Sequence, residues 1–138
     1  MTPKLTLFHI GHLFNTALRE CGRILHEKNL PIDMDQVQVL LYIYYSESGS
    51  QQEIGRGLQR DKASVNRTIA FLSRKGIVDI EPDKQDKRRT IIGLTPSGRE
   101  LAQQVEEILT EFDNTLTAPF TADERKQFSL LIDKLMPW

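Results

Sequence analysis

Residues 50–95 read SQQEIGRGLQRDKASVNRTIAFLSRKGIVDIEPDKQDKRRTIIGLT, a stretch that begins with a helix-start signal. Ser50 and Glu53 have the spacing of a capping box, in which the two side chains bond the free amide groups at the start of a helix. The pattern predicts a short first helix that ends at about Leu58.

A second helix is predicted directly after the first. Asp61 is a favourable N-cap, and the helix is expected to run to about Lys75, where Gly76 provides a C-terminal stop. Two short helices joined by a tight turn predict a helix-turn-helix.

The second helix has an apolar stripe and a polar outer side. Val65, Ile69 and Leu72 recur at helical spacing, which predicts that they pack inward. On the outer side, small residues allow close approach to a DNA groove, asparagine can bond an adenine edge, and arginine can bond guanine or a phosphate. The alternative is an ordinary solvated helix surface. The outer positions are Ala63, Asn66, Arg67, Ala70 and Arg74.

A charged β-hairpin is predicted next. Residues 77–81 alternate as a half-buried strand, and residues 90–94 are rich in β-forming side chains. Residues 82–89 between them are polar, with four cations in the last six positions. Such a tip suits phosphates or a narrow minor groove, and the simpler alternative is a solvated loop.

The order of these motifs resembles the winged-helix transcription regulators of the MarR (multiple antibiotic resistance regulator) family. The most specific match is Asp86-x-Arg88 in the hairpin, followed at fixed spacing by Leu94-Thr95-x-x-Gly98. Lys75-Gly76-Ile77-Val78 closes the second helix, and the motifs cover residues 53–98. Gly55 and Gly57 depart from the pattern, because the family usually has alanine at the first and each glycine costs ~1 kcal/mol inside a helix.

The resemblance implies a mainly α fold with a small β-hairpin wing, in which dimerisation helices flank a winged helix-turn-helix. Residues 33–95 would form the DNA-binding part of a single domain, and residues 1–30 and 96–138 the helical dimerisation part. The first helix and the last two would interlock across a two-fold axis. The homodimer would bind a palindrome-like operator in double-stranded DNA as a repressor.

The resemblance also implies roles for individual residues. Ala63, Ser64, Asn66 and Arg67 match groove-facing positions of the recognition helix. Arg88 matches a wing arginine that reaches the minor groove, and Asp86 matches the carboxylate that braces it. The complete set predicted to bind DNA is Ala63, Ser64, Asn66, Arg67, Arg74, Lys84, Asp86, Lys87, Arg88 and Arg89.

Apolar periodicity predicts helices on both sides of this stretch. Residues 5–29 form a first helix with apolar positions beyond one stripe, and such a helix needs partners on more than one side. Asp33 or Asp35 caps a second helix, which Ser48-Gly49-Ser50 breaks. Helices are also expected to begin after Thr95, with a proline at the first helical position, and after Thr121. The alternative to a dimer is that these helices complete the core of a monomer.

The charge of the chain is unevenly distributed. The 138 residues give room for one compact domain and carry a formal net charge of −1. Residues 56–89 hold ten Lys/Arg and five Asp/Glu, whereas the rest holds eight and fourteen. The cations therefore gather at the predicted reading head, where their field acts locally. With no signal peptide and no apolar run of about 18 residues, we expect a cytoplasmic chain without a membrane partner.

The resemblance further implies that a small phenolic or aromatic ligand releases the DNA from a crevice beside the dimerisation helices. The residues on the bordering helices are His9, His12, Arg19, Tyr42 and Tyr45. Each has a structural alternative, because tyrosines in clusters commonly pack with the hydroxyl at the surface and a lone histidine commonly bonds a neighbour.

Other classes of function find less support in the sequence. There is no nucleophile elbow, phosphate-binding glycine loop or metal-ligand spacing, so we expect no catalytic residue, no cofactor and no metal. Cys21 is the single cysteine and lies on an apolar stripe, which favours an inert core residue over a redox sensor. The main alternative function is a winged-helix protein-interaction module without specific DNA binding, whose recognition face would be less cationic.

Overall fold

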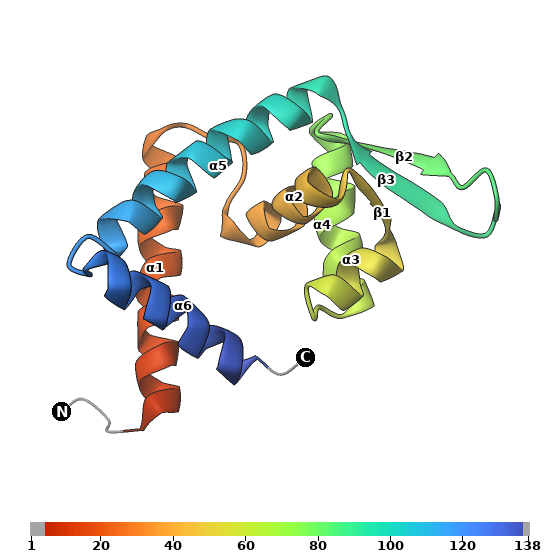
Figure 1. The fold of residues 1–138 in the computed structure, drawn as a ribbon. Coiled ribbons are helices and arrows are strands. Elements are labelled where there is room, and N and C mark those ends of the chain that lie inside the picture. Colours follow the sequence, from red (N-terminus) through yellow and green to blue (C-terminus); the bar gives the residue numbers. More distant parts are fainter. Residues whose placement is uncertain (1–4, 137–138) are drawn as a thin grey trace.

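The computed structural model describes residues 5–136, so residues 1–4 and 137–138 of the predicted helical parts lie outside the described range. Helices and a small antiparallel sheet make up the described residues, which confirms the predicted fold class (Figure 1). The elements are α1 Thr6–Glu27, α2 Met34–Ser46, β1 Ser48–Ser50, α3 Gln51–Gly57, α4 Lys62–Arg74, β2 Val78–Pro82, β3 Thr90–Leu94, α5 Pro96–Leu116 and α6 Ala122–Leu135.

Side-chain caps start five of the helices at residues where the sequence places them. Each cap accepts a hydrogen bond from a backbone N–H in the first turn of its helix. Capping of this kind depends on a few neighbouring residues, which explains why sequence patterns predict it well. The caps are Asp33, Ser50, Asp61, Thr95 and Thr121.

The core lies where α2, α4 and the sheet meet, and α3 and the start of α5 close its sides. The predicted inward stripe of α4 is confirmed, because Val65, Ile69 and Leu72 are all buried. Ile43 of α2 and Ile92 of β3 are also buried in this cluster. The core therefore holds the helix-turn-helix against the base of the hairpin.

The sheet has three strands in the order β1-β3-β2, all antiparallel. The sequence predicts only the β2–β3 hairpin, whereas Ser48–Ser50 was expected merely to break a helix. Glu47 ends α2 with a φ of 66°, and the three residues after it then pair with β3. A third strand results from a stretch without β-forming side chains, because its partner strand supplies the hydrogen bonds.

The hairpin extends beyond the helices as a wing (Figure 1). The expected alternation of buried and exposed residues in β2 is therefore wrong beyond Val78. Ile80 lies opposite Ile92 in the ladder but is 45% exposed. No helix covers the wing at this point, so an apolar side chain there remains in contact with solvent.

The flanking helices leave much apolar surface open. No residue of α6 is buried, and α1 buries only Cys21 and Leu25. Leu7 of α1 is 76% exposed and Leu131 of α6 is 56% exposed. The first half of α1 and the whole of α6 thus do not complete the core of this chain. Within residues 5–136, no helix has the length and apolar character that crossing a membrane requires.

Candidate nucleic-acid interface

Helix α4 presents an exposed face of two arginines and two alanines. Ala63, Arg67, Ala70 and Arg74 are exposed and lie opposite the buried stripe. Asn66 lies at the margin of this face, is half-buried, and has a buried Oδ1 without a hydrogen-bond partner among the described residues. At the centre of the face, the small alanines leave room for a binding partner to approach the helix closely, and the two arginines provide long cationic side chains.

The hydroxyl of Ser64 accepts a hydrogen bond from Arg60. The Arg60 guanidinium donates from Nη2 to Ser64 Oγ at 2.7 Å and to Thr68 Oγ1 at 3.0 Å. It also donates from Nη1 to the backbone carbonyl of Asp35 at 2.9 Å. Ser64 is thus half-buried and bonded within the chain, unlike its predicted partners Ala63 and Arg67, which face outward.

The tip of the wing is organised by Asp86. Its Oδ1 accepts the backbone N–H of Arg88 at 3.0 Å, and its carbonyl accepts the backbone N–H of Arg89 at 3.0 Å. No ion pair joins Asp86 to the Arg88 guanidinium among the described residues. The carboxylate therefore fixes the backbone of Arg88 and leaves its side chain exposed, as are Lys84 and Lys87.

Arg89 points back toward α3. Its Nη2 donates to Glu53 Oε1 at 2.9 Å and to Ser50 Oγ at 3.2 Å. The pKa of the Glu53 carboxyl is lowered, first by the backbone N–H of Ser50 and then by the side chain of Arg89. Glu53 is therefore held as a carboxylate at the foot of the wing.

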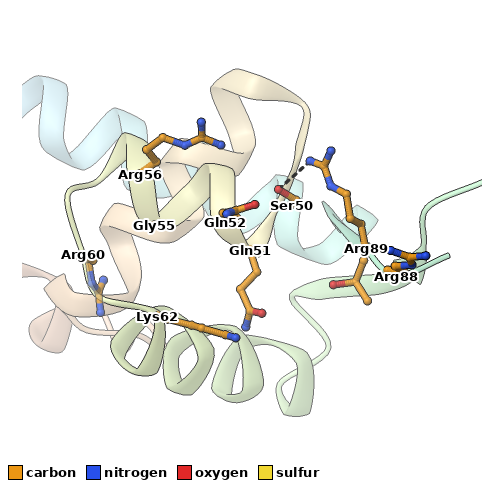
Figure 2. Close-up of a pocket in the computed structure, with 10 residues that line it drawn as sticks. Ser50, Gln51, Gln52, Gly55, Arg56, Arg60, Lys62, Arg88 and Arg89 are labelled. Atoms are coloured by element: carbon orange, nitrogen blue, oxygen red, sulfur yellow. Dashed lines mark hydrogen bonds between the residues drawn. The ribbon is translucent and has the colours of Figure 1, made fainter. Parts of the chain in front are cut away.

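A hollow of about 480 Å³ lies between α3, the start of α4 and the wing (Figure 2). Five of the residues that line it are cations and none is a carboxylate, so its wall is positive. Only Arg88 and Arg89 among the ten lining residues belong to the set predicted to bind DNA. The other eight include Gln51, Gln52, Arg56 and Lys62, which only their position inside the positive stretch 56–89 or in the first turn of α3 signals.

The residues predicted to bind a small ligand are not brought into this hollow. His9, His12 and Arg19 are exposed on α1. The Tyr42 ring lies so close to Gly57 that a Cβ on the glycine would be 2.3 Å from it, and the Tyr45 hydroxyl donates to Glu106 at 2.7 Å. None of the five lines this hollow or a second one between α5 and α6.

Cys21 and the acidic residues offer no further site. Cys21 is buried, and burial raises the pKa of its thiol, which disfavours the reactive thiolate. Within residues 5–136, no three His, Cys, Asp or Glu side chains gather as metal ligands would.

Comparison with known proteins agrees with the motifs. A family profile described as "MarR family" matches residues 30–89. The multiple antibiotic resistance protein MarR of Escherichia coli is 28% identical over 131 residues, which span 93% of this chain and 91% of that protein. The chain is similar in sequence to MarR-family proteins over most of its length. MarR-family proteins are transcription regulators, so the chain is classed with DNA-binding regulators and not with enzymes.

Other relatives and solved structures show how far the similarity extends. The helix-turn-helix transcriptional regulator YdgJ of Bacillus subtilis is 30% identical over 104 residues, and the chain spans only 62% of its length. A crystal structure of an E. coli MarR mutant with operator DNA is similar with a TM-score of 0.79, 27% identity, and coverage of 95% of this chain and 96% of that one. The MepR–DNA complex of S. aureus reaches a TM-score of 0.86 at 25% identity, covering 97% and 98% of the two chains.

Proposed function

We propose that this chain is a homodimeric repressor of the MarR family that binds a palindrome-like operator in double-stranded DNA. Helix α4 enters the major groove with Arg67 and Arg74, and the wing places Arg88 in the adjacent minor groove. Residues 33–95 contact the DNA, and residues 1–30 and 96–138 hold the two copies together.

The observation that carries the proposal is the shared position of the cations. Arg56, Lys62 and Arg88 come from α3, α4 and the wing, and they line one concave positive wall (Figure 2). Phosphates of duplex DNA follow one another along a curved edge, and a concave cationic wall matches that arrangement. The similarity to MarR and MepR structures that contain DNA supports the same orientation.

The open apolar surface supports the homodimer. Extended exposed apolar patches commonly mark a protein interface, and α1 and α6 carry most of the exposed large apolar side chains. A second copy placed across a two-fold axis would cover it. Two wings and two α4 helices could then contact half-sites about one helical turn, ~34 Å, apart.

The cationic face argues against a protein-interaction module. A partner protein would need an acidic surface to match Arg67, Arg74 and the wing cations, whereas duplex DNA supplies negative charge along its whole backbone. The helical repeat of DNA is also compatible with the proposed dimer and its two α4 helices.

The proposal includes release of the DNA by a small phenolic or aromatic ligand. Such a ligand can act only if it binds the DNA-free arrangement more tightly than the DNA-bound one. The relevant crevice would lie between the dimerisation helices and the winged part, with Arg19 and the histidines of α1 as polar neighbours. Benzoate and phenol are suitable first probes, and loss of operator binding at a fixed salt concentration is the readout.

The test of DNA binding is a titration on the chain's own upstream intergenic duplex, with a scrambled duplex as the control. We expect selective binding to the upstream duplex. The logarithm of the association constant should fall steeply with the logarithm of the salt concentration, with a slope of about −0.9 for each phosphate contact that a cation neutralises. Equal binding to both duplexes by folded, dimeric protein would contradict the proposal and shift it to a protein partner.

A further inference from the structure

Two arginines stand side by side in the wing, and their side chains take opposite directions. Arg88 is exposed at the tip, whereas the Arg89 guanidinium donates to Ser50 Oγ at 3.2 Å (Figure 2). It also donates to Glu53 Oε1 at 2.9 Å. Ser50 and Glu53 are 39 and 36 positions away in sequence. The contact thus joins the wing to the start of α3.

The acceptors on α3 are held in place before Arg89 reaches them. Ser50 is 4% exposed and donates its backbone N–H to Glu53 Oε2 at 2.9 Å. Glu53 in turn donates its backbone N–H to Ser50 Oγ at 3.2 Å. This reciprocal capping box fixes both acceptors. Binding of the arginine therefore costs little additional conformational entropy in the side chains of Ser50 and Glu53.

The backbone of Arg89 closes the wing tip at the same time. Its N–H donates to the carbonyl of Asp86 at 3.0 Å, and its carbonyl accepts the N–H of Asp83 at 2.9 Å. One residue therefore links the tip loop through its backbone to α3 through its side chain. Both links therefore constrain the position of the preceding residue, Arg88.

We propose that Arg89 is a positioning residue for the wing, anchored on Glu53, and that it sets the place of Arg88 instead of contacting a phosphate itself. The inference rests on the proposed DNA-binding function and proposes for Arg89 a role other than the direct DNA contact that the sequence predicts. The positive charge of Arg89 is matched by the carboxylate beside it. The wing therefore gains rigidity from this arginine and little net charge.

Glu53 makes this proposal separable from a purely electrostatic account. The side chain is an anion next to the cationic hollow, so on charge alone its neutralisation would strengthen DNA binding. If Glu53 is the anchor, Glu53→Gln instead weakens binding, because the wing loses its fixed angle. Glutamine still accepts the Ser50 N–H as a capping-box residue, so the start of α3 survives the change.

The experiment measures binding to the chain's upstream duplex and its dependence on salt concentration. The single variants are Arg89→Gln, Glu53→Gln and Arg88→Gln, and the double variants combine Arg88→Gln with each of the other two. Arg23→Gln is the matched control, because Arg23 also forms exposed ion pairs but lies on α1. We expect Arg89→Gln and Glu53→Gln each to weaken binding about threefold to fivefold without changing the salt slope, a range that fits an exposed ion pair. In the Arg88→Gln background, either second change should alter binding less than about twofold.

Two results would overturn the proposal. One is Glu53→Gln binding as tightly as wild type or more tightly. The other is an Arg89→Gln loss that adds fully to that of Arg88→Gln and lowers the salt slope by about 0.9, which is the behaviour of a phosphate contact.

A second measurement on the free protein separates this inference from the proposed function. Hydrogen exchange of the Asp83 and Arg89 amides should become faster in both Arg89→Gln and Glu53→Gln, and should stay unchanged in Arg23→Gln. Unchanged exchange in the first two variants would overturn the anchor. Wild type that binds no duplex selectively would refute the DNA-binding proposal, and the exchange result would still decide whether Arg89 holds the wing.

Discussion

Gly98 packs without a side chain against the backbone carbonyl of Ile77. A Cβ at this position would lie 2.0 Å from that oxygen, which is too close for any real contact. The same carbonyl accepts the backbone N–H of Thr95 at 3.1 Å, so the Thr95-x-x-Gly98 pattern wraps the start of α5 around the end of α4. The glycine is a requirement of this close approach.

Replacement of Gly98 by alanine should therefore destabilise the fold. We expect Gly98→Ala to lower the free energy of unfolding by about 1–3 kcal/mol, as overpacking does elsewhere, measured by urea denaturation. Gly93→Ala is the control, because nothing lies within 4 Å of a Cβ there. Equal stability of the two variants would refute this explanation of the motif.

Gly57 shows why a residue can look unfavourable in sequence and be required in the fold. Its helix cost of ~1 kcal/mol relative to alanine is visible from local propensity alone. The reason for accepting that cost is the Tyr42 ring, which stands where a Cβ would be. Tyr42 is thereby a packing partner of α3, a role that no spacing between residues 42 and 57 could indicate.

The hydrogen-bond partners of Arg60 and Arg89 also could not be predicted from the sequence. Helix caps connect residues two or three positions apart, and all five were predictable. Arg60 and Arg89 bond groups 25 and 36 positions away, so a local reading counts them only as surface cations. The concentration of cations in residues 56–89 was thus visible in the sequence, but which of them remain free was not.

Helix α4 is held at its start by one arginine. Arg60 bonds two hydroxyls of α4 and the Asp35 carbonyl at the start of α2, so it fixes the recognition helix against its neighbour. We expect Arg60→Met to lower the free energy of unfolding by about 1–3 kcal/mol, because three acceptors lose their donor.

The same variant distinguishes a structural arginine from a DNA contact. The salt slope of operator binding should be unchanged in Arg60→Met, with Lys62→Met as the matched variant that lowers it by about 0.9. Full stability of Arg60→Met together with a flatter salt slope would show that Arg60 contacts a phosphate.

In the proposed function, the wing contributes Arg88 at its tip. Arg88→Ala should weaken operator binding severely, because the cation is lost where a narrow minor groove is most negative. The dimer mass from sedimentation should stay the same, since the wing is far from α1 and α6 (Figure 1). An unchanged operator affinity would remove the wing from the mechanism.

Strand β1 marks the limit of prediction at the level of elements. Ser48-Gly49-Ser50 contains no residue that favours a strand, and the three residues pair only because β3 lies beside them. The long helices and the hairpin have strong internal patterns and were predicted to within a few residues. A strand of three residues has a tertiary cause, which only the folded chain reveals.

The whole molecule is expected to be a dimer joined through α1 and α6. Leu131 lies on the apolar side of α6, so Leu131→Glu should place a charge in the interface and shift the sedimenting species toward monomer. Ser129→Glu adds the same charge to the opposite side of α6 and serves as the control. Wild-type protein that sediments as a monomer, or a Leu131→Glu dimer as stable as wild type, would contradict this interface.

The proposed dimer would extend the DNA contacts beyond those of one protomer. One protomer offers one α4 helix and one wing, enough for a single half-site. Two protomers related by a two-fold axis would cover two half-sites, and the affinity of the pair would exceed that of either alone. The proposal thus explains the apolar surface of the flanking helices and the cationic face of the winged part together.

Hydroxyl-radical footprinting of the protein on its upstream duplex tests this arrangement most directly. We expect two protected blocks related by symmetry, with centres about one helical turn apart, and loss of both blocks in Arg88→Ala. Uniform cleavage, or a single block that persists in Arg88→Ala while the protein is folded and dimeric, would contradict it.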